Sequence, residues 1–93
     1  MGDLVAALEL AERLADEGRR VGLVANVHRR NENRRVAVYF EYFVLYVDVH
    51  TGEVFGTVAG KPVGFHMSEA KAVAFTHERA AMRIRYFAEV LGG

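Results

Sequence analysis

The segment Val36–Val49 restricts the fold of this chain more than any other, because it is apolar at both even and odd positions. The even positions carry Val36, Val38, Phe40, Tyr42, Val44 and Tyr46, and the odd positions carry Ala37, Tyr39, Phe43, Leu45, Val47 and Val49. Side chains alternate between the faces of a strand, and a half-exposed antiparallel strand is apolar on one face only. Both faces of this strand should therefore be covered, and a chain of 93 residues has few elements to cover them.

The composition also favours association. Residues 1–93 suffice for one domain, which buries a modest fraction of its surface, yet 52% of them are hydrophobic. Twelve basic residues balance twelve acidic ones, so the net charge does not predict a nucleic-acid or membrane partner. The absence of cysteine excludes disulfides, thiolate nucleophiles and Cys-ligated zinc.

The sequence predicts a cytoplasmic protein without a membrane partner. Asp3 and Glu9 interrupt any apolar segment typical of a signal peptide, and the longest apolar run, Tyr42–Val47, is far too short to span a membrane. Arginine outnumbers lysine, glutamine is absent and Ser68 is the one serine, a composition that resembles that of thermophilic proteins. The alternative is GC-rich codon usage, which gives a similar bias.

The N-terminal third predicts a helix and a strand. Asp3 is a good N-cap, and apolar residues at helical spacing predict an amphipathic helix over Leu4–Glu17. Gly18 stands where a left-handed residue commonly ends a helix. The segment Arg20–His28 alternates apolar and polar residues and predicts a strand with one apolar face.

The remaining elements complete an α+β domain of order αβββα. We expect a turn over Arg29–Arg35, a long strand over Arg35–Val49, a turn at His50–Gly52, a third strand over Glu53–Ala59, a loop marked by Gly60, Pro62 and Gly64, and a second helix from the Ser68 cap to Leu91. The three strands form an antiparallel meander. Both helices pack on one face, and a second subunit covers the other.

The long strand exceeds both neighbours in length. Each of its halves would leave one edge unpaired, and open edges invite strand addition from another chain. The alternative is a bulge near Glu41 that folds the sheet back on itself.

The second helix carries two apolar stripes. The broad stripe suits the sheet, whereas Phe75, Met82 and Tyr86 form a second stripe interleaved with Arg79. Aromatic residues, Met and Arg are enriched at protein interfaces, so we predict that this stripe binds a partner. The sheet would contribute Tyr42 and Tyr46 from one face, or Tyr39 and Phe43 from the other. The alternative is that the first helix covers the stripe within the monomer.

Basic residues gather at the first hairpin tip. Arg29, Arg30, Arg34 and Arg35 could bind phosphates, because guanidinium groups match phosphate geometry. The alternative is a solvated turn that blocks edge-to-edge aggregation.

Motifs for catalysis, metals or cofactors are incomplete, so we predict none of these sites. His77-Glu78 begins a zincin pattern, but Ala81 occupies the second histidine position. Gly60-Lys61 is followed by Pro62 where a phosphate loop needs Ser or Thr. A metal-dependent nuclease would want Lys two residues after an acid, yet Phe43 and Phe55 follow Glu41 and Glu53 at that spacing.

Two partial resemblances add to this interpretation. The order αβββα is similar to that of double-stranded RNA-binding domains, although Ser68-Glu69-Ala70-Lys71 lacks the paired lysines that those domains carry at this helix. The segment Tyr46–Gly56 (YVDVHTGEVFG) resembles the closing hairpin of PepSY domains, which are small inhibitory or regulatory modules.

The leading hypothesis is a small non-enzymatic interaction module that works as a homodimer or in a tight complex with another protein. The alternative is a nucleic-acid-binding protein that uses the Arg29–Arg35 tip. A metal-dependent nuclease is the weaker alternative.

Overall fold

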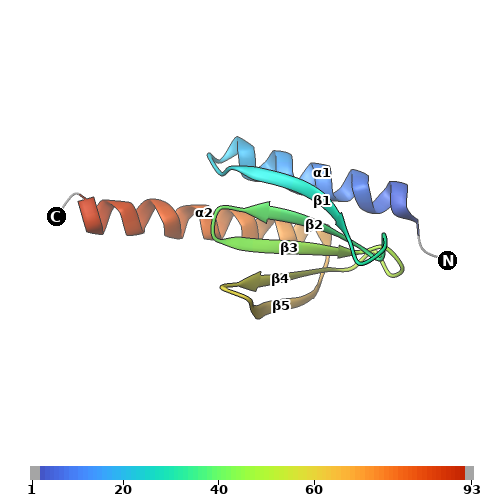
Figure 1. Ribbon diagram of the computed structural model, residues 1–93. Helices are drawn as coiled ribbons and strands as arrows, with labels where there is room; N and C mark the ends of the chain where they lie inside the picture. Colours follow the sequence, from blue (N-terminus) through green and yellow to red (C-terminus); the bar gives the residue numbers. More distant parts are fainter. Residues whose placement is uncertain (1–2, 92–93) are drawn as a thin grey trace.

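The computed structural model describes the backbone of residues 3–91 and the side chains of residues 3–83. Its elements are α1 (Leu4–Arg20), β1 (Ala25–Arg30), β2 (Arg35–Phe40), β3 (Phe43–Asp48), β4 (Val54–Val58), β5 (Lys61–Met67) and α2 (Glu69–Leu91). The five strands form one antiparallel sheet in the order β1-β2-β3-β4-β5, with both helices alongside it (Figure 1). The α+β class is confirmed.

The predicted three-stranded meander is wrong in two places. The expected strand Arg35–Val49 is a hairpin, in which β2 and β3 are joined by a turn at Glu41–Tyr42. The expected loop after Ala59 instead forms β5, which pairs with β4 through an irregular register. The order is therefore αβββββα, and the likeness to double-stranded RNA-binding domains, which was based on αβββα, is lost.

The hairpin explains why this segment is apolar at both parities. Tyr39 pairs with Val44, so the chain reverses over two residues. The side chains that face the core are therefore those at even-numbered positions in β2 and at odd-numbered positions in β3. Val36 and Val38 then lie on the same side of the sheet as Leu45 and Val47, and all four are fully buried. Much of the apolar content thus faces a single core.

The Glu41–Tyr42 turn is held by contacts from distant parts of the chain. One carboxylate oxygen of Glu41 accepts a hydrogen bond from the backbone N–H of Val24 at 3.1 Å, and the other pairs with the Arg83 Nε at 2.8 Å. The rings of Phe40 and Phe43 stack at 4.6 Å between centroids. The turns favoured in two-residue hairpins need positive φ, which neither Glu41 nor Tyr42 adopts. Tertiary contacts therefore stabilise a turn that the local sequence does not favour.

Both helices pack on one face of the sheet and against each other. α1 contacts β1, β2 and β3, whereas α2 contacts β4, β5 and α1. Asp3 caps α1 by accepting from the Ala6 N–H at 3.1 Å, and Ser68 accepts from the Lys71 N–H at 3.2 Å. The helices are joined by a two-bonded pair between Arg13 and Glu69, with both N···O distances at 2.9 Å. No helix in the described part of the chain is both long and apolar enough to cross a membrane.

Gly18 lies inside α1 and does not end it, contrary to the prediction. The helix continues to Arg20, and the left-handed residue after it is Gly22, with φ of 93°. A Cβ at Gly18 would lie 2.1 Å from the Phe40 Cε1 atom. Glycine is required here because the helix backbone approaches the Phe40 ring too closely for any side chain.

We expect Gly18→Ala to lower the free energy of unfolding by about 1–3 kcal/mol, because the added methyl overpacks the core. Urea unfolding measures the change. Gly18→Ala should cost less stability when it is introduced into the Phe40→Leu variant than when it is introduced into the parent. Full additivity of the two substitutions would contradict the contact.

We expect Glu41→Ala to destabilise the protein by about 0.5–2 kcal/mol, since it removes solvent-exposed hydrogen bonds that join three segments. Glu41→Gln retains an acceptor for Val24 but loses the ion pair with Arg83, so its unfolding midpoint in urea should lie between those of the parent and Glu41→Ala. Equal stability of all three proteins would show that the turn forms without these contacts.

Candidate functional site on the open face of the sheet

The sheet surface opposite the helices, called the open face below, is the strongest candidate site. Alternation and register assign to it Asn26, His28, Arg30, Arg35, Ala37, Tyr39, Val44, Tyr46, Asp48, Phe55 and Thr57, and Phe65 joins it at the β5 edge. The residues of the described hydrophobic core lie on the other side, with the helices. No described element of the chain packs across the open face.

Aromatic rings run across the open face from β2 to β5. Tyr46 and Phe55 are cross-strand neighbours whose rings stack at 5.1 Å between centroids, with 20° between their planes. Tyr39 lies on β2, and the His28 ring meets it edge-on at 5.6 Å. Phe65 is 63% exposed on β5. Phe65 thus exposes most of its apolar surface, whereas Tyr39, Tyr46 and Phe55 are half-buried among their neighbours.

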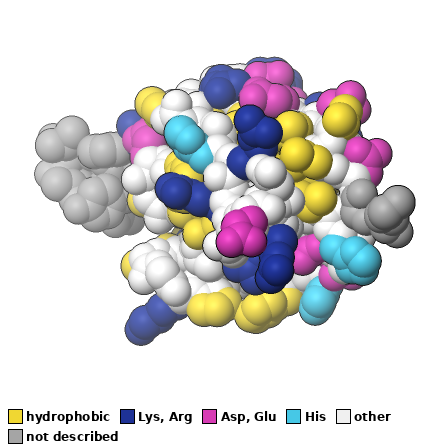
Figure 2. Space-filling model, turned by 45° about the vertical axis from the view of Figure 1, so that its right-hand side comes forward, with side chains coloured by type: hydrophobic (Ala, Val, Ile, Leu, Met, Phe, Trp, Pro, Cys, Tyr) yellow, Lys and Arg dark blue, Asp and Glu magenta, His cyan; other side chains and the backbone are white. Residues whose placement is uncertain are grey.

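Two arginines lie against these rings. The Arg30 Nε donates a hydrogen bond to the Tyr39 hydroxyl at 2.6 Å, and its guanidinium lies 5.3 Å from the centre of that ring. The Arg35 guanidinium lies 4.9 Å from the centre of the Phe55 ring. Figure 2 shows basic and hydrophobic side chains interleaved on one side of the molecule, with acidic ones among them.

Most described arginines on the helices form ion pairs; Arg79 is the exception, with its guanidinium against the Phe75 ring. Arg13, Arg19, Arg20 and Arg83 each pair with a carboxylate. Among the described side chains, no carboxylate forms an ion pair with any arginine of the first hairpin tip. The tip itself carries four arginines and one acid, Glu32, and is positive, whereas Asp48 and Glu53 lie close to Arg35.

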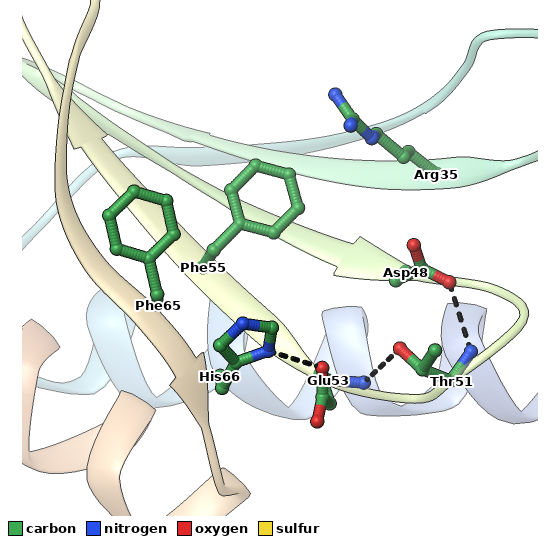
Figure 3. Close-up of a pocket in the computed structure, with 7 residues that line it drawn as sticks. All are labelled: Arg35, Asp48, Thr51, Glu53, Phe55, Phe65 and His66. Carbon is green, nitrogen blue, oxygen red and sulfur yellow. Dashed lines mark hydrogen bonds and ion pairs between the residues drawn. The ribbon is translucent and has the colours of Figure 1, made fainter.

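A pocket of about 310 Å³ lies at the β4–β5 side of the open face. It is lined by Arg35, Asp48, Thr51, Glu53, Phe55, Phe65 and His66 (Figure 3). The Phe55 and Phe65 rings stand side by side on neighbouring strands, with Arg35 reaching over from β2. The Glu53 carboxylate pairs with the His66 ring at 2.5 Å. The pocket combines apolar walls with one guanidinium that has no described anionic partner.

Asp48 shapes the turn beside this pocket. Its carboxylate accepts hydrogen bonds from the backbone N–H groups of Thr51 at 2.9 Å and His50 at 2.8 Å. These bonds, that from Thr51 foremost, hold the pKa of the Asp48 carboxyl below its ordinary value. Asp48 is thus anionic at neutral pH and is occupied with the turn.

The residues predicted for a subunit interface divide between two regions. Phe75 is half-buried with its ring 5.7 Å from that of Phe43, and the Arg79 guanidinium lies 5.1 Å from the Phe75 ring. The Tyr42 hydroxyl donates to the Arg79 carbonyl, and burial raises the pKa of this phenol. Met82 is 43% exposed nearby.

The other two predicted interface residues do not join this group. Tyr46 lies on the open face, on the opposite side of the sheet. Tyr86 lies outside the described side chains.

The basic tip predicted for phosphates forms the loop between β1 and β2. Arg30 and Arg35 face each other at the hairpin end and belong to the open face, whereas Arg29 has the opposite parity and Arg34 lies in the loop. Three consecutive loop residues, Asn31–Asn33, have positive φ. Only half of the predicted cluster therefore borders the aromatic row.

Sequence reasoning did not assign Phe55 and Phe65 to any site. Phe55 stands in a predicted strand, and its alternation with Val54 was the available signal. Phe65 was expected in a loop, so its alignment with Phe55 depended on recognising β5.

Among the described residues, no cluster of three or more His, Asp or Glu side chains could hold a metal ion. No known family model, curated protein or solved structure matches this chain at a significant level.

We expect Asp48→Asn to flatten the acid dependence of stability. A carboxyl whose pKa is lowered by folding stabilises the protein above its unfolded pKa, here near 3.8, and this contribution is lost as pH falls through the folded pKa. Urea midpoints measured from acid to neutral pH should therefore fall less in Asp48→Asn than in the parent. Asp48→Ala, which also loses the acceptor, should be less stable than Asp48→Asn at neutral pH. Parallel profiles for parent and Asp48→Asn would contradict the assignment.

Proposed function

We propose that this protein is a small non-enzymatic interaction module whose working form is a homodimer, joined through the C-terminal end of α2. The observation that supports the proposal is the length of this helix. α2 has 23 residues, about 34 Å, whereas the strands have five to seven residues and extend about 17–24 Å. Figure 1 shows the helix running past the ends of the strands.

Contacts mark where α2 leaves the sheet. The β2–β3 turn touches the helix at two points: the Tyr42 hydroxyl bonds to the Arg79 carbonyl, and Glu41 pairs with Arg83. The turn is the last part of the sheet in this direction, so residues 84–91 continue beyond it.

The sequence of the projecting segment, IRYFAEVL, is mostly apolar. Isolated helices shorter than about 12–15 residues are marginal in water, and most helical stability in proteins comes from packing. A projecting apolar segment of eight residues therefore favours a partner. The adjoining described surface has matching chemistry, since Met82 is exposed and Tyr42 and Arg79 lie beside it.

A second copy of the chain is the proposed partner. Closed two-fold symmetry is the commonest form of assembly, and in it the same patch meets itself. The segment is apolar on each copy, so pairing would cover both at once. We propose no catalytic role, because the sequence motifs for catalysis are incomplete.

The proposal is tested by sedimentation velocity over a range of concentrations. The parent should sediment as a dimer, and Met82→Ser/Tyr86→Ser should shift it to a monomer. The matched control Val5→Ser/Val24→Ser removes two exposed apolar side chains elsewhere, which are 64% and 61% exposed, and should remain dimeric. A parent that stays monomeric and soluble at high micromolar concentration, or a variant that remains dimeric, would refute the proposal.

A further inference from the structure

We infer that the open face binds single-stranded nucleic acid, with bases stacked on its aromatic row and phosphates on Arg30 and Arg35. This inference concerns a surface separate from the C-terminal end of α2 and does not depend on the homodimer. It starts from a juxtaposition that the sequence does not reveal, in which rings from four strands and two guanidinium groups lie on one uncovered side of the sheet.

The rings come from four neighbouring strands, with Tyr39 two residues along from the Tyr46–Phe55 pair. Tyr39, Tyr46, Phe55 and Phe65 come from β2, β3, β4 and β5, and neighbouring strands lie about 4.8 Å apart. The row therefore extends about 14 Å across the sheet. Aromatic residues on an open sheet commonly stack two or three bases in this way, and stacking accepts every base because each has a π face.

The arginines supply the complementary charge. Arg30 and Arg35 are paired across the end of β1 and β2, and each guanidinium lies beside a ring of the row. No described carboxylate pairs with either of them, so their remaining donors are available to phosphate oxygens. The two acids nearest to the row are already engaged, Asp48 in its turn and Glu53 with His66.

Single strands fit this surface better than duplexes or a second copy. In a duplex the bases are stacked inside and present only their edges, so they cannot stack on the exposed Phe65 ring. A face-to-face pair of copies would bring two unpaired arginines from each chain into one interface, with Asp48 as the acid on the face. Burying cations without paired anions is costly, whereas phosphates provide the anions.

The test is fluorescence anisotropy with a labelled oligothymidylate of about twelve nucleotides, titrated over a range of salt concentrations. The parent should bind at low salt, with log K falling by about 0.7 per decade of salt for each phosphate contacted. Arg30→Ala/Arg35→Ala should weaken binding and flatten this slope by about 1.4. The control Arg20→Ala/Lys71→Ala removes the same charge from the helices and should retain the parental slope and affinity within about twofold.

The aromatic contribution needs its own pair of variants, because general charge attraction could mimic the first result. Phe65→Ala should weaken binding by about 5- to 150-fold at constant slope, while Val63→Ala on the same strand changes it little. Both side chains are exposed, so neither variant should unfold the protein.

Four outcomes would overturn the inference. The first is no binding by the parent at low salt, and the second is an equal loss of affinity in the arginine variant and its control. The third is equal affinity of Phe65→Ala and Val63→Ala, and the fourth is tighter binding of a duplex of the same length. Sedimentation of the Arg30→Ala/Arg35→Ala and Phe65→Ala variants without nucleic acid adds a fifth. Dissociation of the dimer by these substitutions would assign the open face to a contact between copies. Failure of the homodimer itself leaves the anisotropy result unaffected.

Discussion

The Glu41 carboxylate is the interaction on which the rest of the fold depends. It joins the loop before β1, the β2–β3 turn and α2, by accepting from the Val24 N–H and pairing with Arg83. Without a reversal at this position, β2 and β3 would form one long strand with apolar side chains on both faces. With it, the inward-facing positions change from even in β2 to odd in β3, and the apolar residues at these positions share one core under the helices. One acid in an apolar run thus stabilises the turn that separates β2 from β3.

The same reversal produces the surface with the clearest chemical character. The outward positions of the β2–β3 hairpin carry Tyr39 and Tyr46, and β4 and β5 extend this row with Phe55 and Phe65. Ion pairs are concentrated on the helical side of the molecule, which leaves the arginines beside the row without described carboxylate partners. The projecting end of α2, apolar in sequence, and the aromatic and basic open face are therefore two separate parts of the molecule.

Local signals in the sequence predicted several elements well. The Asp3 cap and the helical spacing after it gave the start of α1, and Ser68 gave the start of α2. Predictions failed where local chemistry was uninformative. Gly18 looked like a helix end but is required by the approach of Phe40, and the glycines after Ala59 looked like a loop although the chain there pairs with β4. In each case a contact far along the chain outweighed the local preference.

The sequence by itself determined the α+β class, the two helices, and the presence of more apolar surface than a simple sheet of this size would need. It also placed four arginines at one hairpin tip, because that segment is too polar to be anything but a turn. Only the tertiary structure decided how many strands there are, which side chains share a face, and which arginines meet aromatic rings. The physical reason is that the position of a turn decides which side chains of the next strand face the core. The Glu41–Tyr42 turn is stabilised by Val24, 17 residues before Glu41, and by Arg83 on the last helix.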